Sequence, residues 1–334
     1  MKAVILNGPG NVTVGEFPTP TPKAGEVRVR VAFCGICGSD FHKVAGKKNT
    51  HPVRYPVPLG HEISGVVESV GEGVAAFRPG DRVTVDPNWS CGKCYYCKNG
   101  QTSFCENGRG VVKGMAEFVV SPEENVYLLP DGLSLRDAAL CEPLACCLRG
   151  MDLLDIHQGE RVALIGLGAI GTIMLQLIRR AGAGEVLVID ANEARRETAM
   201  ALGATLFLSA GDGAAIADYA KTHPVGRVIE CVGVGPAQET ALEVAGKGAT
   251  VVMFGVSDSA AKLPISLYDA FCKELTIKTS FVNPHTTDRA LQLLATGLLE
   301  TDKIIAGELS MEEAAAEMLS PTLSRKGKAL VRID

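Results

Sequence analysis

Aromatic residues and long apolar runs are both scarce in this sequence. Of its 334 residues, 5% are aromatic, and tryptophan occurs once. The longest apolar stretches are RVALIGLGAIG and TIMLQLI, which glycines interrupt or which end at Arg179 and Arg180. None approaches the roughly 20 apolar residues that are needed to cross a bilayer. We therefore expect neither a transmembrane segment nor a membrane partner.

The sequence also lacks an excess of positive charge. It has 33 lysines and arginines against 38 aspartates and glutamates, and its formal net charge is −5. Surfaces that bind nucleic acid are usually strongly basic. The composition therefore argues against a nucleic-acid partner.

The first residues lack the pattern of a secretory signal peptide. The start, MKAVILNGPG, reaches glycine and proline before an apolar run of sufficient length can form. We therefore expect a cytoplasmic protein.

Length and glycine content favour two α/β domains. A chain of 334 residues exceeds the size at which a single hydrophobic core keeps growing. Hydrophobic residues make up 46% of the chain, and its 37 glycines suit tight turns between strands and helices.

The hydrophobic pattern changes along the chain. Up to about residue 140 it predicts short strands: KAVIL, EVRVRVAF, ISGVVESVG, DRVTVD and AEFVV. From about residue 160 it predicts six strands alternating with helices: RVALI, EVLVID, ATLFL, RVIECVG, ATVVMFG and LTIKTS. This alternation is typical of a doubly wound parallel sheet. The tail carries two amphipathic helices, TTDRALQLLATGLL and SMEEAAAEML, and a β run, KALVRID, that could return to the first domain.

Four of the 11 cysteines lie in the short run CGKCYYCKNGQTSFC. At this spacing Cys91, Cys94, Cys97 and Cys105 can deliver four thiolates to one tetrahedral zinc ion, which leaves no position for substrate. A disulfide framework is the rival interpretation, and the odd cysteine count and the lack of a signal peptide disfavour it. The cluster predicts a structural zinc site. We interpret most of the other thiols as small buried side chains.

Cys37 stands apart from this cluster, upstream of the pair His61 and Glu62. One thiolate, one imidazole and one carboxylate can hold zinc and leave a coordination position for substrate. We therefore predict a second, catalytic zinc, and two zinc ions per chain.

The segment GLGAIG follows a predicted strand and opens a predicted helix. Gly166 would make the tight turn, Gly168 would let backbone N–H groups approach a pyrophosphate, and Gly171 would let the helix pack close to the sheet. Ala169 and Ile170 lie at the helix N-terminus, which favours an anion. The segment predicts a dinucleotide site.

Asp190 ends the strand EVLVID, 19 residues after Gly171. There it would accept hydrogen bonds from both ribose hydroxyls and repel a 2′-phosphate, which favours NAD over NADP. Arg195 leaves an alternative open, because its guanidinium either accommodates that phosphate or lies in solvent. We also assign Val232 and Gly255, at the ends of two later predicted strands, to the cofactor site.

A dinucleotide domain combined with an open metal site indicates hydride transfer from an alcohol. Zinc would act as a Lewis acid on the hydroxyl, and NAD would accept the hydride. The sequence therefore predicts an oxidoreductase.

Several motifs extend over the chain: GICGSDFH (35–42), GHEISGVVESVGEGV (60–74), PGDRV (79–83), the four-cysteine run, CEPLAC (141–146), GLGAIG (166–171) and ECVG (230–233). Together they resemble the zinc-dependent medium-chain dehydrogenases. The resemblance implies a GroES-like, β-rich catalytic domain of residues 1–143 and 281–334. It also implies a Rossmann domain of residues 144–280, and a homodimer or homotetramer.

The resemblance assigns roles at the open site. Cys37, His61 and Glu62 correspond to catalytic zinc ligands. Glu142 corresponds to a fourth ligand, or to a carboxylate that binds the zinc-bound water and can take the alcohol proton.

Ser39 and His42 correspond to a proton relay toward the cofactor ribose and solvent. The alternatives are a capping role for Ser39 and a surface position for His42. Asp40 is expected to orient the local turn. We place the other histidines on the surface or in packing roles: His51, His157, His223 and His285.

The substrate class follows from the position of Glu142. Glu142, Pro143 and Leu144 match the EPL sequence of sorbitol-type polyol dehydrogenases, whereas many simple alcohol dehydrogenases carry a cysteine there; Cys141 is one residue out of register. A polyol is therefore favoured.

Two departures put sorbitol itself in doubt. Val282 stands where sorbitol dehydrogenases have an arginine, and the segment between Cys105 and Ala116 is shorter than usual. Four cations lie between the first two candidate ligands: Lys43, Lys47, Lys48 and Arg54. They form either a solvated loop or a contact with a phosphate or carboxylate of the substrate.

We thus predict NAD- and zinc-dependent oxidation of a secondary hydroxyl of a polyol or sugar derivative to a ketone. The alternatives within the family are a polyol phosphate, a sugar acid, butanediol or threonine as substrate. A non-catalytic NAD-binding zinc protein is a minor alternative.

Overall fold

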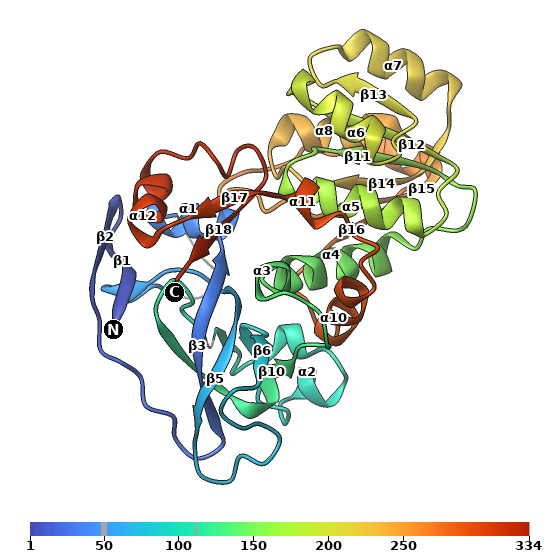
Figure 1. Ribbon diagram of the computed structural model, residues 1–334. Helices are drawn as coiled ribbons and strands as arrows, with labels where there is room; N and C mark the ends of the chain where they lie inside the picture. Colours follow the sequence, from blue (N-terminus) through green and yellow to red (C-terminus); the bar gives the residue numbers. More distant parts are fainter. Residues whose placement is uncertain (48–51, 111, 334) are drawn as a thin grey trace. The chain divides into compact units, whose positions relative to one another are not determined.

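The structure is a computed structural model that describes residues 1–47, 52–110 and 112–333. The chain divides into two compact units: Met1–Cys146 with Val282–Asp334 form unit 1, and Cys147–Phe281 form unit 2. The sequence placed these divisions after residues 143 and 280. The chain begins and ends in unit 1 (Figure 1). The predictions for Lys48 and His51 lie outside the described residues.

Unit 1 is rich in antiparallel strands. Its largest sheet has seven strands in the order β10-β6-β5-β3-β18-β17, with β9 also paired to β3. A second sheet has the order β2-β1-β4, and β7 pairs with β8. The strands are β1 (Lys2–Gly8), β2 (Asn11–Glu16), β3 (Glu26–Gly35), β4 (Val57–Pro58), β5 (Glu62–Val70), β6 (Arg82–Val85), β7 (Asn88–Trp89), β8 (Arg109–Gly110), β9 (Phe118–Pro122), β10 (Val126–Leu128), β17 (Ile305–Leu309) and β18 (Lys328–Arg332).

The C-terminal run returns to unit 1, as the sequence predicted. Strand β18 pairs antiparallel with β3, and Leu330 lies opposite Gly35. The helices of this unit are α1 (Gly38–Val44), α2 (Tyr95–Lys98), α3 (Leu135–Ala138), α10 (Thr287–Ala295), α11 (Thr301–Ile304) and α12 (Met311–Leu319), with single 3-10 turns at Thr102–Phe104 and Glu123–Asn125. Helices α10 and α12 were predicted, whereas α11 and β17 were not.

The core of unit 1 follows from the alternation of β3. Val27, Val29 and Val31 are fully buried, while the arginines between them are not. Met311 and Met318 of α12 belong to the same buried cluster. Burying one such side chain stabilises the fold by about 1.5–3 kcal/mol. The tail of the chain therefore helps to build the core of the first domain.

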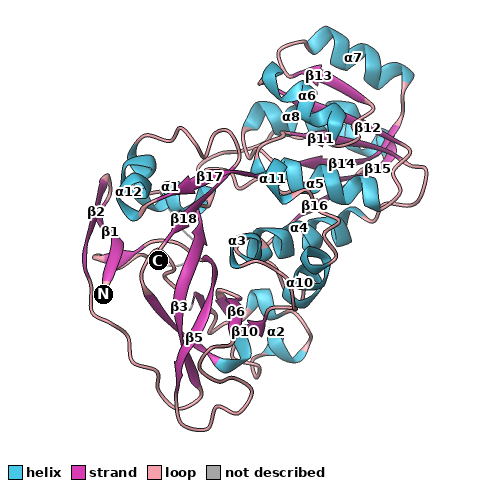
Figure 2. Ribbon diagram, viewed as in Figure 1, coloured by secondary structure: helices cyan, strands magenta, loops and turns pink. Residues whose placement is uncertain are grey.

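Unit 2 has one sheet of six parallel strands in the order β13-β12-β11-β14-β15-β16. Figure 2 shows helices along this sheet. The elements are β11 (Arg161–Ile165), α5 (Ala169–Arg180), β12 (Glu185–Asp190), a 3-10 turn (Glu193–Arg195), α6 (Arg196–Ala201), β13 (Leu206–Ser209), α7 (Gly213–Thr222), β14 (Val225–Glu230), α8 (Gly235–Val244), β15 (Ala245–Met253), α9 (Leu267–Lys273) and β16 (Thr276–Thr279). Helix α4 (Cys141–Leu154) begins in unit 1 and ends in unit 2. All six strands of the predicted doubly wound sheet are present.

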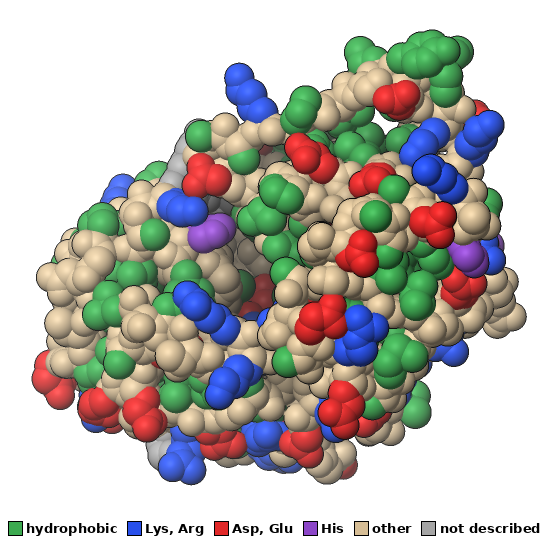
Figure 3. Space-filling model, turned by 90° about the horizontal axis from the view of Figure 1, so that it is seen from above, with side chains coloured by type: hydrophobic (Ala, Val, Ile, Leu, Met, Phe, Trp, Pro, Cys, Tyr) green, Lys and Arg blue, Asp and Glu red, His purple; other side chains and the backbone are tan. Residues whose placement is uncertain are grey.

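On the face drawn in Figure 3, side chains of both charges are interspersed. No helix in the described ranges is long and apolar enough to span a bilayer.

Candidate functional site

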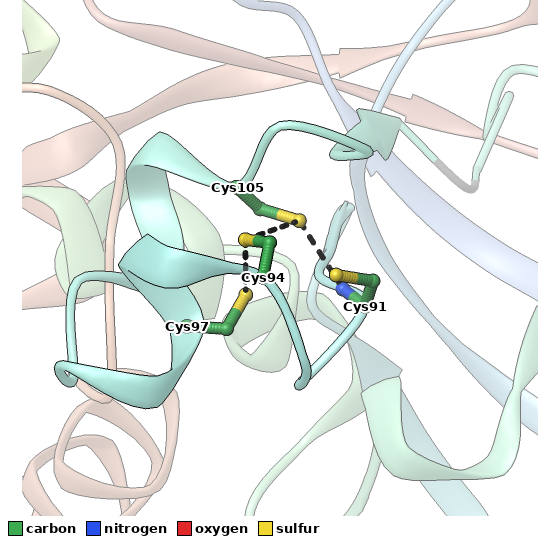
Figure 4. A group of neighbouring side chains, drawn as sticks. All are labelled: Cys91, Cys94, Cys97 and Cys105. Carbon is green, nitrogen blue, oxygen red and sulfur yellow. Dashed lines mark hydrogen bonds between the residues drawn. The ribbon is translucent and has the colours of Figure 1, made fainter.

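The four clustered cysteines converge on one point. Cys91, Cys94, Cys97 and Cys105 have sulfur atoms that all lie within 4.8 Å of one another. Figure 4 shows the sulfurs pointing together from α2 and the loops around it. The Sγ atom of Cys94 is 3.5 Å from that of Cys97 and 3.9 Å from that of Cys105. Tetrahedral zinc thiolates have sulfurs about 3.8 Å apart, so the cluster fits this metal.

Hydrogen bonds to sulfur surround this cluster. The pKa of the Cys91 thiol is lowered to about 6 by the backbone N–H of Lys93 and by the side chain of Asn107, which donates at 3.6 Å. The pKa of Cys94 is also lowered, mainly by the backbone N–H of Cys97. The thiolate is the form that binds a metal. The local backbone thus favours the thiolate form of Cys91 and Cys94, whereas burial and the neighbouring thiols raise the pKa of Cys97 to about 11.

The second candidate site lies where β3 ends and β5 begins. Glu62 is the first residue of β5 and pairs with Gly35 near the end of β3, which brings Cys37 beside it. The ligand atoms of Cys37, His61 and Glu62 lie within 4.8 Å of one another. A thiolate, an imidazole and a carboxylate are all zinc ligands, so this group also fits the metal.

Asp40 supports this group from inside the protein. It is fully buried, and its carboxylate accepts hydrogen bonds from the Cys37 N–H at 3.2 Å and from Lys43 Nζ at 3.3 Å. Its Oδ1 atom lies 3.7 Å from His61 Nδ1, which is buried and has no hydrogen-bond partner among the described residues. Metal-binding histidines commonly direct their second ring nitrogen to a carboxylate. The sequence predicted only the orientation of the turn by Asp40.

His61 lies in a negatively charged environment. Burial opposes its protonation, but the charges of Asp40 and Cys37 outweigh burial and raise the pKa of His61 well above its usual value. The same surroundings would attract a cation of any kind. The environment of His61 thus suits a bound metal.

Lys328 is a residue at this site that sequence reasoning missed. Its Nζ atom lies 2.7 Å and 2.8 Å from the two carboxylate oxygens of Glu62 and 3.1 Å from the carbonyl oxygen of Ile36. Both charged side chains are almost fully buried. Lys328 is distant in the sequence, so no local motif could have indicated it. The predicted return of KALVRID to the first domain was the one available signal.

Glu142 lies in the first turn of α4 and is half-buried. Among the described residues it is not part of the group that lies within 4.8 Å. Burial raises the pKa of Glu142 to about 7, and the charges of Glu62 and Asp86 add to this effect. His61 and Lys328 oppose it. Glu142 is thus within electrostatic reach of the other candidate ligands, although the structure does not place it among them.

The remaining predicted residues near the metal group lie on or after α1. Ser39 and His42 are both half-buried in this short helix. Of the four cations, Lys43 is directed inward to Asp40, whereas Lys47 and Arg54 are exposed. Lys43 thus has a partner within the protein.

The glycine-rich loop of unit 2 has the conformation that its sequence predicted. Gly166 has a φ of +90°, and a Cβ atom there would collide with Val232. A Cβ atom at Gly171 would collide with the Gly166 carbonyl, whereas one at Gly168 would meet no atom within 4 Å. Gly168 precedes α5, which begins at Ala169 and continues through Ile170. The loop therefore has no room for a side chain at Gly166 and Gly171, at its ends, but has room at Gly168, at its centre.

Asp190, the last residue of β12, fixes the conformation of this loop by hydrogen bonds. Its Oδ2 atom accepts hydrogen bonds from the Leu167 N–H at 2.6 Å and from Arg195 Nη1 at 2.8 Å. Its Oδ1 atom accepts one from the Asn192 N–H at 2.7 Å. Asp190 therefore shapes the loop, and its charge is partly offset by Arg195.

A second buried carboxylate shapes the turn after β14. The predicted strand RVIECVG ends early, at Glu230. The Glu230 carboxylate accepts hydrogen bonds from the N–H groups of Val232 and Gly233, the latter at 2.7 Å, which turns the chain. A Cβ atom at Gly255 would collide with Gly233, so the two glycines pack against each other. Val232 is 47% exposed beside the glycine-rich loop.

Comparisons with known proteins identify the family. A model described as "Alcohol dehydrogenase GroES-like domain" matches residues 23–131, and one described as "Zinc-binding dehydrogenase" matches residues 169–296. A 2-dehydro-3-deoxy-L-galactonate 5-dehydrogenase of Pseudoalteromonas atlantica is 32% identical over 342 residues, which cover 100% of this chain and 99% of that protein. The chain belongs to the zinc-dependent medium-chain dehydrogenases.

Other members of the family refine this result. A sorbitol dehydrogenase of Bacillus subtilis is 28% identical over 328 residues, or 95% of this chain and 92% of that protein. The crystal structure of a zinc-binding dehydrogenase from Sinorhizobium meliloti, bound to NADP, superposes with a TM-score of 0.93 at 36% identity and 99% coverage of both chains. This medium-chain dehydrogenase is an oxidoreductase of the polyol and sugar group. The predictions of its family and fold class are confirmed.

Proposed function

We propose that the chain is a zinc- and NAD-dependent dehydrogenase that oxidises a secondary hydroxyl of a polyol or sugar derivative to a ketone. The observation that carries this proposal is the grouping of Cys37, His61 and Glu62 in a chain that also has the tight loop held by Asp190. Such a reaction needs a Lewis acid and a hydride acceptor. The two sets of residues fit those two requirements.

The metal ligands proposed for catalysis are Cys37, His61 and Glu62, and Glu142 is either a fourth ligand or a carboxylate that binds the zinc-bound water. A zinc ion held there would polarise the substrate hydroxyl, and NAD would accept the hydride. Glu142 is suited to take the hydroxyl proton, because its raised pKa of about 7 lies near neutral pH.

Two further proposals concern proton transfer and metal content. Ser39 and His42 would pass the proton on from α1, on which both lie. The cluster around Cys94 would hold a second zinc ion that supports the fold.

The cofactor proposal rests on Asp190. A carboxylate at the end of the second strand of the dinucleotide fold binds the ribose hydroxyls of NAD. The contact of Arg195 with Asp190 and the NADP bound to the Sinorhizobium meliloti relative support the alternative, NADP. Gly166, Gly168 and Gly171 would serve either cofactor through the pyrophosphate.

We propose a substrate from the polyol and sugar class. One relative is a sorbitol dehydrogenase, and another acts on a sugar acid, as its name states. Polyol phosphates, butanediol and threonine stay as alternatives. The exposed cations Lys47 and Arg54 are the candidates for contact with an anionic substrate.

We also propose that the protein is a homodimer or homotetramer. Leu267, Tyr268 and Phe271 of α9 are 76–82% exposed, which is unusual for large apolar side chains on a short helix. Exposed apolar surface of this kind commonly marks an interface. Replacing Phe271 with glutamate should lower the molar mass in solution, as measured by light scattering.

The test of the main function combines two measurements. Polyols, their phosphates and sugar acids are screened with NAD and with NADP for formation of the reduced nicotinamide, and bound zinc is measured per chain. Turnover with about two zinc ions would support the dehydrogenase. About one zinc ion, with no turnover on any substrate, would support a non-catalytic NAD-binding protein instead.

A further inference from the structure

Three polar side chains are buried where the chain enters α10. Asn283, Thr286 and Thr287 are 1%, 2% and 3% exposed. Burying a polar group costs free energy unless the group makes hydrogen bonds. The backbone of the same segment is also unusual, since Val282 and His285 have φ of +48° and +57°, values that residues other than glycine rarely adopt. Such conformations persist where surrounding contacts hold them, and they cluster at functional sites. The segment is therefore a candidate for a functional role.

The position of Thr286 suggests a helix cap, but its hydroxyl makes other bonds. Thr286 occupies the N-cap position of α10, where a threonine side chain normally accepts from a backbone N–H of the first turn. In the described structure it makes no such bond. Its hydroxyl instead donates to the carbonyl oxygen of Ala145, in α4, at 2.8 Å and to that of Asn283 at 3.1 Å. Capping of α10 thus does not explain why this hydroxyl is buried.

A second contact joins the segment to α4, and further bonds anchor it on Asp86. The Cys141 thiol, at the start of α4, donates to the Thr287 carbonyl oxygen at 3.6 Å. The Asp86 carboxylate accepts from the Thr287 hydroxyl at 3.1 Å and from Asn283 Nδ2 at 3.3 Å. Asn88 Nδ2 donates to Asn283 Oδ1 at 2.6 Å. The segment is thus fixed to the chain after β6 on one side and to α4 on the other.

The contacts with α4 fix the rotation of this helix about its own axis. Cys141 and Ala145 are four residues apart, so they lie on one face of the helix. Glu142 directly follows Cys141, about 100° further around the axis. Its carboxylate accepts from the Cys146 thiol at 3.5 Å, and a thiol is a weak donor. The direction of the Glu142 side chain therefore depends mainly on how α4 is held.

We propose that Thr286 is a positioning residue for the reaction. Its bond to the Ala145 carbonyl holds the first turn of α4 and so sets the direction of Glu142, the candidate proton acceptor. This inference rests on the proposed function and deepens it. Asn283 and Asp86 act one step further away, because they hold the segment that carries Thr286.

The first experiment compares Thr286→Val with Thr286→Ser. Valine keeps the shape of the side chain but cannot donate, whereas serine keeps the hydroxyl. Thr286→Val should lower kcat by about tenfold, at the low end of the range for residues that orient groups at a metal site, and leave the dissociation constant of NAD unchanged. In protein loaded with Co²⁺ it should also shift the visible spectrum, because cobalt bands report the geometry around the metal. Thr286→Ser should restore both kcat and the spectrum.

A double-mutant cycle tests whether Thr286 acts through Glu142. If it does, adding Thr286→Val to Glu142→Gln should change kcat by less than about twofold, because the group that Thr286 positions is already replaced. Thr296→Val is the matched control: it removes a hydroxyl that donates to the Leu293 carbonyl within the α10 region, and it should leave kcat and the spectrum unchanged. If Thr286→Val folds poorly, Cys141→Ala removes the other contact with α4 and should lower kcat by about threefold, since a thiol is the weaker donor.

Two results would overturn the inference and leave the proposed function standing. One is a Thr286→Val protein whose melting temperature falls but whose kcat and cobalt spectrum match those of the wild type, as expected of a residue that only stabilises the fold. The other is a loss of kcat on adding Thr286→Val to Glu142→Gln that is as large as the loss in the wild-type background. If Glu142→Gln itself keeps the wild-type kcat, the proposed role of Glu142 fails, and the inference fails with it.

Discussion

The two groups of candidate metal ligands in unit 1 are built in opposite ways. All the ligands of the cysteine cluster come from residues 91–105, and the backbone of the same segment and Asn107 donate to their sulfurs. The open group takes Cys37 from the second residue after β3, and it takes His61 and Glu62 from the residue before β5 and the first residue of β5. It then adds Asp40 from α1 and Lys328 from β18.

This difference explains which function each group can serve. Four thiolates and local N–H donors make a site that is complete within its own segment, as structural zinc sites are. The open group has one thiolate, one imidazole and one carboxylate, and that carboxylate pairs with Lys328, which is distant in the sequence. Its properties can therefore be adjusted by residues that are not ligands.

The largest expected effect comes from removing the only thiolate of the open group. Cys37→Ser should lower kcat/KM by at least ~10³-fold, because a metal that stabilises charge in the reaction contributes several kcal/mol. The bound zinc should fall by about one ion per chain, and the melting temperature should change little. A steady-state assay, metal analysis and a thermal melt measure the three quantities. Turnover equal to that of the wild type would refute the assignment.

Removing a thiolate from the closed cluster should affect stability first. Cys94→Ser should weaken a metal that contributes on the order of several kcal/mol to folding, and so lower the melting temperature by roughly 10 °C. Folded Cys94→Ser protein in which Co²⁺ replaces zinc should keep the wild-type visible spectrum of the open group. Circular dichroism during heating checks the first expectation. If Cys94→Ser melted at the wild-type temperature but lost its activity, the cysteine cluster would be the catalytic site and the open group the structural one.

The difference between ligands that are close in the sequence and ligands that are distant also explains which features could be predicted from the sequence. The four-cysteine cluster was evident from spacing alone, since its ligands are close in the sequence. The six strands of unit 2 were evident from their alternation with helices, and most clearly at β11 and β12, which are buried apolar runs, whereas β16 is partly exposed. The early end of β14 was missed, because it depends on the side chain of Glu230 turning the chain.

The open group was only partly predictable. Cys37, His61 and Glu62 were named from their residue types and then matched to the family motifs, and the antiparallel register of β3 and β5 explains why they meet. Lys328 was missed, because a lysine in a short C-terminal strand gives no sign that it will be buried against a carboxylate. Long-range electrostatic partners of this kind appear only when strands distant in the sequence pair.

A smaller effect should follow from changing Asp40, which supports His61 without belonging to the ligand group. Asp40→Asn keeps the shape but removes the charge behind the imidazole, and zinc affinity at the open group should fall by about 10–100-fold. Competition with a chelator measures this affinity. Lys43→Met, which removes a lysine that pairs with Asp40, is the matched variant and should weaken zinc less. Unchanged affinity in Asp40→Asn would mean that Asp40 only caps α1.

The smallest effect is expected from Asn107→Ala at the closed cluster. Asn107 donates to Cys91 at 3.6 Å, and backbone N–H groups also donate to the thiols of this cluster. Losing one of several donors should cost about 1 kcal/mol or less, and metal release from the cluster should change by less than about fivefold. The measurement is the same chelator assay that is used for Asp40→Asn. A larger loss for Asn107→Ala than for Asp40→Asn would reverse the comparison, because it would make the closed site the one that depends on a supporting side chain.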